Sequence, residues 1–76
     1  MRYSLITTDS WGHDIDVLSS NTLPPLMEPF TEFCETIYNV SQGTKDPFDL
    51  YCVQILDHDY MSRQIMRYSV AEALGL

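Results

Sequence analysis

The segment between Pro24 and Gly43 constrains the fold more than any other part of this chain. Its apolar residues recur every three or four positions, which is the spacing of one face of an α-helix. They are Leu26, Phe30, Phe33, Cys34, Ile37 and Val40. Gly43 follows the last of them and is suited to end the helix, because glycine readily adopts a positive φ. A long apolar face has to be buried, so the rest of the chain must supply a surface that it can cover.

The start of this helix is less sharply marked than its end. Asn21 or Thr22 can cap the first turn, and a proline is well tolerated there because its missing N–H would have no helical partner. Pro29 lies deeper in the pattern. The helix either begins within residues 24–27 and bends at Pro29, or becomes regular only near Glu28. We expect the earlier start.

Three segments have the composition of β-strands. Residues 2–8 (RYSLITT) and 13–19 (HDIDVLS) carry β-branched residues in partial alternation, and residues 9–12 (DSWG) between them suit a turn. This pattern predicts an N-terminal β-hairpin. Residues 49–56 (DLYCVQIL) form a nearly continuous apolar run, which is typical of a strand at the centre of a sheet.

A second helix is expected from Asp57 or Asp59 to about Leu74. The apolar positions that suggest it are Met61, Ile65, Met66, Val70, Ala73 and Leu74. The elements then follow in the order strand, strand, helix, strand, helix (ββαβα). This order predicts a single α+β domain over residues 1–76, in which two helices pack on a three-stranded sheet.

Charge limits the kinds of partner that the chain can have. It contains eleven acidic and four basic residues, a net charge of −7 at pH 7. The phosphates of nucleic acids and anionic membranes repel such a chain, so we expect neither to bind it directly. A partner protein with a basic surface is favoured by the charge, although acidity alone also keeps a small domain soluble.

Nothing in the sequence suggests export or insertion into a membrane. The apolar runs are much shorter than a segment that spans a bilayer, and no charged region followed by an apolar one opens the chain. Cys34 and Cys52 are too few for a disulfide framework and suit buried, reduced thiols. We therefore expect a cytoplasmic protein.

Both histidines lie among acidic residues, in HDID at 13–16 and in DHD at 57–59. Together the two clusters could supply nitrogen and oxygen ligands for a metal, or an acid–base pair. Adjacent residues point in different directions, however, and the spacings typical of zinc sites are absent.

Both clusters also have a simpler structural explanation. Asp57 or Asp59 can accept hydrogen bonds from the free N–H groups at the start of the second helix. Asp14 and Asp16 alternate with apolar residues, so they share the solvent-facing side of an edge strand, where charge deters pairing with other chains.

Neither a G-x-S-x-G motif nor a phosphate-binding glycine loop is present. We expect no metal, no cofactor and no enzymatic activity.

The most unusual feature is the charge of the first helix. Glu28, Glu32 and Glu35 are spaced at i, i+4 and i+7, so they form one acidic stripe. No Lys or Arg occurs between Asn21 and Gln42 to offset it. Like charges four residues apart weaken a helix slightly. One explanation for keeping such a stripe is functional: it attracts a partner with a basic surface. The alternative is that glutamates near a helix N-terminus complement its dipole, which explains Glu28 better than Glu35.

These features predict a non-enzymatic protein-binding module. The first hypothesis is a small acidic inhibitor that occupies a basic, nucleic-acid-binding surface of another protein, as a nucleic-acid mimic does. Phage-encoded anti-CRISPR and anti-restriction proteins often have such a composition, and the analogy rests on composition alone. The alternatives are a homodimeric adaptor and a metal-dependent site at the Asp/His clusters. Trp11, in the hairpin turn, is a candidate anchor. The predicted partner-binding residues are Glu28, Glu32, Glu35, Asp14, Asp16 and Trp11.

Overall fold

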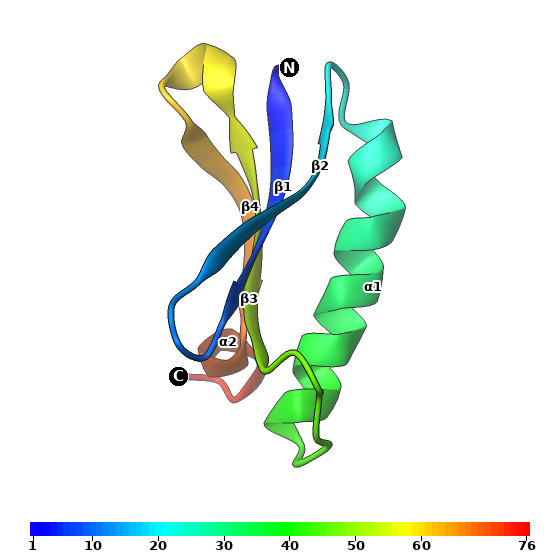
Figure 1. Cartoon of the computed structure of the whole chain (residues 1–76), viewed down its shortest axis with the longest axis vertical. Coiled ribbons are helices and arrows are strands. Elements are labelled where there is room, and N and C mark those ends of the chain that lie inside the picture. Colours follow the sequence, from blue (N-terminus) through cyan, green and yellow to red (C-terminus); the bar gives the residue numbers. More distant parts are fainter.

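Four strands, one long helix and one short helix follow one another along the chain, and the computed structural model describes all of residues 1–76 (Figure 1). The elements are β1 (Tyr3–Asp9), β2 (Asp14–Ser20), α1 (Pro24–Ser41), β3 (Leu50–Asp57), the 3₁₀ turn η1 (His58–Tyr60), β4 (Arg63–Ser69) and α2 (Val70–Ala73). The strands form one antiparallel sheet in the order β2-β1-β3-β4. This arrangement confirms the predicted α+β class, the N-terminal hairpin and the central place of β3.

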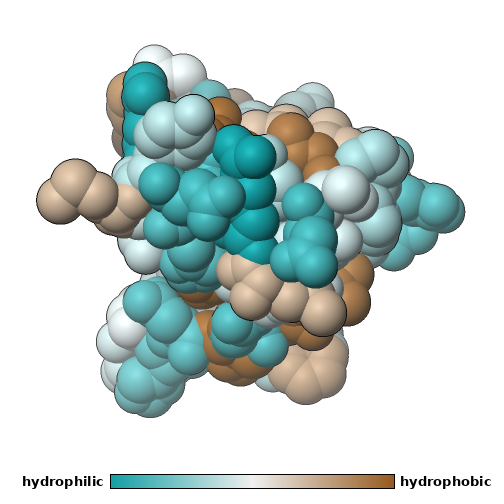
Figure 2. Space-filling view, turned by 90° about the horizontal axis from the view of Figure 1, so that it is seen from above, coloured by the Kyte–Doolittle hydropathy of each residue, from teal (hydrophilic) through white to brown (hydrophobic).

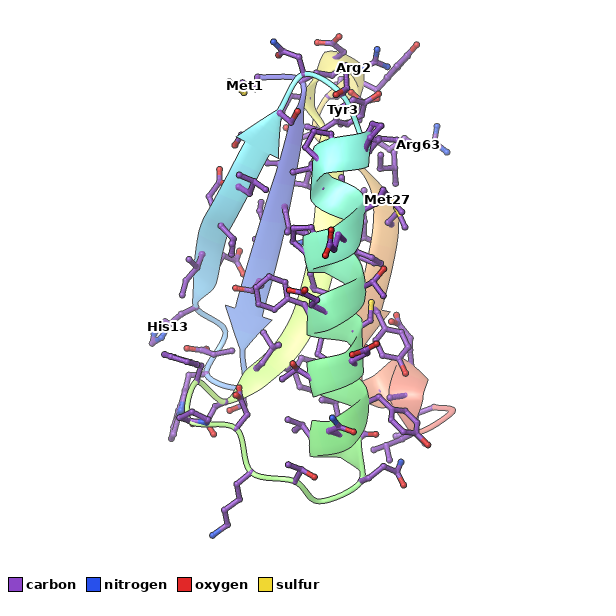
Figure 3. The ribbon with its side chains drawn as sticks, turned by 90° about the vertical axis from the view of Figure 1, so that its right-hand side faces the viewer. Met1, Arg2, Tyr3, His13, Met27 and Arg63 are labelled. Carbon is purple, nitrogen blue, oxygen red and sulfur yellow. The ribbon has the colours of Figure 1, made fainter.

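The hydrophobic core lies between α1 and one face of the sheet. Leu5 on β1 pairs with Ile55 on β3, and both side chains are fully buried. Leu26, Phe30 and Ile37 join them from α1 in one cluster. The predicted apolar stripe of this helix is therefore the side that it turns toward the sheet. Figures 1 and 3 show from two directions how the helix lies along one face of the sheet.

Both ends of α1 match the expected positions, but its N-terminal cap does not. The helix begins at Pro24, and Gly43 lies just beyond its last turn with a φ of 100°. Leu23 occupies the N-cap and makes no side-chain hydrogen bond to the helix. The prediction of Asn21 or Thr22 as the cap was wrong. The Asn21 amide oxygen instead accepts a hydrogen bond from the backbone just before β1, 3.3 Å away.

The last third of the chain differs from the second helix that was predicted from Asp57 or Asp59 to about Leu74. After β3 the chain forms η1, turns, and returns as a fourth strand. The sheet therefore has four strands instead of three, and the order is ββαββα instead of ββαβα. Met61 and Ser62 make the turn with left-handed φ values of 60° and 57°, which an α-helix cannot accommodate.

The fourth strand forms because the outer edge of β3 can pair with it. Met66 pairs with Ile55, and Tyr68 lies two positions further along the same face, so both reach the core. Burial against the sheet outweighs the helical spacing of the same residues. The chain becomes helical again only at α2, where the Ser69 hydroxyl accepts a hydrogen bond from the backbone N–H of Glu72 at 3.4 Å.

The face of the sheet that points away from α1 is more open. Ile6, Gln54 and Leu56 are half-buried on it.

Figure 2 looks onto the end of the molecule that holds the N-terminus, and hydrophilic side chains gather near the centre of this view. Neither helix combines the length and the hydropathy that are needed to cross a lipid bilayer.

Candidate functional site

The three glutamates of the acidic stripe lie on the side of α1 that points away from the sheet. Glu28, Glu32 and Glu35 are exposed, whereas Leu26 and Ile37 on the other side of the helix are fully buried. None of the three carboxylates forms an ion pair within the molecule, and α1 itself contains no Lys or Arg. The stripe is thus a single negative surface along the middle of the helix, from Glu28 to Glu35.

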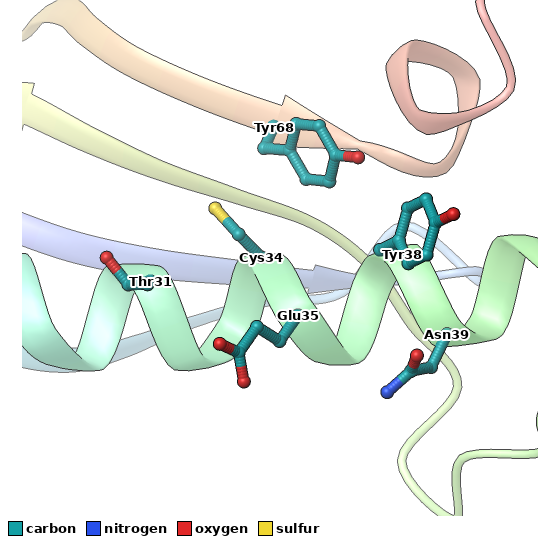
Figure 4. A pocket seen from close by; sticks show the side chains of 6 residues that line it. All are labelled: Thr31, Cys34, Glu35, Tyr38, Asn39 and Tyr68. Atoms are coloured by element: carbon teal, nitrogen blue, oxygen red, sulfur yellow. The ribbon is translucent and has the colours of Figure 1, made fainter.

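A shallow pocket of about 370 Å³ lies beside this stripe, between α1 and β4. Thr31, Cys34, Glu35, Tyr38 and Asn39 line it from α1, and Tyr68 lines it from β4 (Figure 4). Tyr38 is 51% exposed, and Tyr68 packs partly against the core. Glu35 belongs to both the stripe and the pocket, and Figure 4 shows its side chain pointing away from the two tyrosine rings, so its carboxylate marks the side of the pocket that borders the stripe. This combination suits a cationic side chain, which both a carboxylate and an aromatic face attract.

The pocket also contains a thiol. Burial raises the pKa of Cys34 above its ordinary value, so the group stays protonated at neutral pH. It contributes an apolar surface to the pocket and is a poor nucleophile. Cys52 is buried in β3, and neither cysteine forms a disulfide.

Asp14 and Asp16 lie on a different surface from the stripe. They pair with Thr8 and Ile6 of β1, and these residues point away from α1. Thr8 Oγ1 donates to Asp14 Oδ1 at 2.7 Å, and Ser19 Oγ donates to Asp16 Oδ1 at 3.4 Å. The predicted place of both aspartates on an exposed face of an edge strand is confirmed. The sheet separates them from the glutamates on α1.

Trp11 projects from the turn between β1 and β2 and is 78% exposed. Asp9 organises this turn, because its Oδ1 accepts the backbone N–H groups of Trp11 and His13, each at 2.9 Å. The hydrogen bond from the His13 backbone is the main cause that lowers the pKa of Asp9. The indole therefore stands at the tip of the hairpin, beside β2 and apart from the glutamate stripe.

Asp57 is buried at the end of β3 and is paired with a cation. Arg2 donates from Nε to Oδ1 and from Nη2 to Oδ2, each at 3.1 Å, and this guanidinium holds the pKa of Asp57 below its ordinary value. Asp57 Oδ1 also accepts the backbone N–H of Asp59 at 3.1 Å. The predicted capping role of Asp57 is confirmed, although the element that it caps is the short η1 and not a long helix.

His58 takes part in contacts that sequence spacing does not reveal. Its Nε2 lies 2.8 Å from Ser4 Oγ, and its Nδ1 lies 2.9 Å from Ser62 Oγ. A serine beside a histidine can form a nucleophile and base. Ser4 is buried, however, and neither Ser4 nor His58 lines any of the grooves on the surface. The contact ties β1 to the connection between β3 and β4.

The two Asp/His clusters lie at opposite ends of β1 and do not form one site. His13 contacts Asp9, whereas His58 contacts Ser4. Figure 3 shows His13 well away from Arg2, at the far end of the hairpin, and Arg2 pairs with Asp57. No group of three His, Cys, Asp or Glu side chains is arranged to hold a metal ion.

We compared the chain with family models, with curated proteins and with solved structures, and none of the three comparisons gives a match.

Proposed function

We propose that this protein is a non-enzymatic binding module that attaches to a basic surface of another protein. The observation that carries the proposal is the outer side of α1, where Glu28, Glu32 and Glu35 have no counter-ion and Glu35 adjoins a pocket with two tyrosines. Charge of one sign on an exposed surface speeds association with a surface of opposite sign. Lysine and arginine side chains of the partner meet the carboxylates of the stripe.

The pocket adds an anchor to this electrostatic attraction. A partner's lysine or arginine can lie against Tyr38 and Tyr68, and the negative charge of Glu35 at the side of the pocket adds to its attraction. A cation over an aromatic ring contributes about 0.5–1 kcal/mol at an exposed site and more where water is excluded. Tyrosine and arginine are also common among the residues that dominate binding energies.

We further propose that the basic surface is one that binds nucleic acid. Such surfaces are rich in lysine and arginine, and their affinity for phosphates falls steeply with salt. A row of carboxylates can occupy the same side chains and exclude the nucleic acid. The protein then acts as an inhibitor by competition, and its own binding weakens as the salt concentration rises.

The test compares the partners that three forms of the protein capture from native cells. The first form is the wild type. The second carries Glu28→Gln, Glu32→Gln and Glu35→Gln, and glutamine preserves helix propensity. The control carries Asp49→Asn, Asp59→Asn and Glu72→Gln, which remove the same charge from exposed positions outside α1.

We expect the control to keep the partner and the glutamine variant of the stripe to lose it. Capture by all three forms would show that the stripe has no role. Loss by both variants would show that net charge alone is responsible. The competition hypothesis also requires that an excess of nucleic acid displaces the captured partner, and continued binding of both together would contradict it.

A further inference from the structure

The edge strand β2 exposes a row of large apolar side chains. Ile15, Val17 and Leu18 are 58%, 43% and 39% exposed. Ile15 and Leu18 pair with Thr7 and Leu5 of β1, so they lie on the same face of the sheet as the core. On β1 and β3 this face is covered by α1, whereas Figure 3 shows β2 to one side of the helix and largely uncovered. An apolar surface of this kind on a small protein is typical of an interaction site.

A groove of about 520 Å³ runs between β2 and α1. Ile15 and Val17 form its wall on β2, and Phe33 and Thr36 form its wall on α1. Phe48, in the loop before β3, closes one end and is 81% exposed. Four large apolar side chains thus line a space that the chain itself leaves unfilled.

Two carboxylates give this groove a negative charge. Asp9 and Asp46 both line it. Asp46 Oδ2 accepts the backbone N–H of Leu50 at 2.9 Å, and no Lys or Arg pairs with either aspartate. Hydrogen bonds from backbone N–H groups hold both carboxylates in place.

We propose that β2 and this groove bind an extended segment of a partner protein, which pairs with the free edge of β2 as a fifth strand. β2 is paired on one side only, so its outer edge presents unpaired backbone N–H and C=O groups. In strand addition the backbone supplies affinity, and pockets for alternate side chains supply specificity. Aliphatic residues at alternate positions of the segment pack against Ile15, Val17 and Phe48. The lysine or arginine residues between them point to the opposite face of the sheet, where Asp14 and Asp16 lie. Asp9 and Asp46 add negative charge on the groove side.

The charge of β2 favours a different protein over a second copy of this chain. Asp14 and Asp16 extend from β2, so edge-to-edge pairing of two copies would bring four carboxylates together. Like charges on neighbouring strands are destabilising, and each copy also carries a net charge of −7. A basic segment removes this repulsion and replaces it with attraction. The inference concerns a site other than the stripe on α1, and it is tested separately.

The probe is a fluorescein-labelled peptide that alternates valine and lysine and is as long as β2, seven residues. Two control peptides are matched to it: one groups the valines together, and the other has glutamate in place of lysine. We expect the alternating basic peptide alone to bind, as measured by fluorescence anisotropy. The amide signals of residues 14–20 should shift in NMR spectra and exchange more slowly with solvent.

Variants of exposed side chains locate the site without disturbing the core. Ile15→Thr keeps a β-branched residue, and Phe48→Ala removes a ring that is almost fully exposed. Each should weaken binding of the basic peptide about 5- to 20-fold. Met61→Ala is the matched control, because Met61 is 97% exposed beyond the other end of β3, and it should leave the affinity unchanged. Asp16→Asn removes a carboxylate from the face that the lysines meet, and it should weaken binding most at low salt.

Several outcomes would overturn the proposal. These are equal binding of the peptide with grouped valines, no binding at about 1 mM peptide, and chemical-shift changes confined to the outer side of α1. A dimer that Ile15→Thr dissociates would make a second copy the occupant. The glutamine variant of the stripe separates the two sites, because it should lose the captured partner and still bind the peptide within about twofold at physiological salt.

Discussion

Asp57 is an ionised side chain in a buried position, and Arg2 is the group that keeps it ionised. The pair forms two parallel hydrogen bonds of 3.1 Å, a geometry that arginine and a carboxylate favour. The guanidinium also lies over the rings of Tyr3 and Tyr60, at 5.0 and 5.6 Å from their centroids. One side chain at the start of β1 thus stabilises the end of β3 and the turn that follows it.

This pair predicts how stability depends on pH. The folded pKa of Asp57 is lower than its unfolded value, so the stabilisation is complete above about pH 4 and is lost as the pH falls through the folded pKa. We expect the urea midpoint of the wild type to fall steadily below about pH 4. Asp57→Asn should have a lower midpoint than the wild type at pH 7 and a weaker dependence on acid. Asp49→Asn, which changes an exposed acid, should follow the wild type, and parallel curves for all three proteins would contradict the prediction.

Among the elements, α1 is predictable from the sequence because one period describes it throughout. Its apolar residues fit a helix and no strand, and the hairpin and β3 are similarly unambiguous. β4 is different, because Ile65, Met66 and Val70 fit a helical stripe while Met66 and Tyr68 also fit an alternating strand. The segment becomes a strand because it can pair with the free edge of β3. The position of that edge cannot be inferred from the local sequence.

In the candidate site, too, features that follow from the period of one element could be predicted, and features that depend on strand pairing could not. The exposure of Glu28, Glu32 and Glu35 follows from their place opposite the apolar stripe, so it could be predicted. The pocket beside them could not, because Tyr68 reaches it only through the register of β4 on β3. The contact of His58 with Ser4 depends on the pairing of β1 with β3 in the same way.

Pro29 lies inside α1 and is a testable weakness of that element. A proline there cannot donate to the carbonyl of Pro25, and its ring crowds the same carbonyl. We expect Pro29→Ala to restore the hydrogen bond and to raise the free energy of unfolding by about 1–3 kcal/mol. Thermal unfolding followed by circular dichroism measures the change. A lower melting temperature would show that packing of the Pro29 ring is worth more than the missing bond.

Across the whole molecule, the face of the sheet that α1 covers is shielded from solvent, whereas the opposite face is partly exposed. Ile55 on the first face is fully buried, whereas Ile6 on the second is half-buried. We expect Ile55→Ala to lower the free energy of unfolding by about 2–5 kcal/mol. Ile6→Ala makes the same chemical change on the open face and should lower it by about 1 kcal/mol. Denaturation with urea measures both, and equal losses would show that the second face is covered in solution. If Ile55→Ala does not fold, Ile55→Val should still cost about 0.5–1.5 kcal/mol.

The central place of β1 affects how the molecule is made. Its partner on one side, β2, follows directly, but its partner on the other side is β3, and Tyr3 pairs with Asp57. During translation the first strand therefore leaves the ribosome long before half of its backbone hydrogen bonds can form. Contacts between distant residues slow folding, and unpaired strands in the meantime are prone to aggregate. The nascent hairpin therefore keeps one strand edge unpaired and its apolar face uncovered until α1 and β3 have formed.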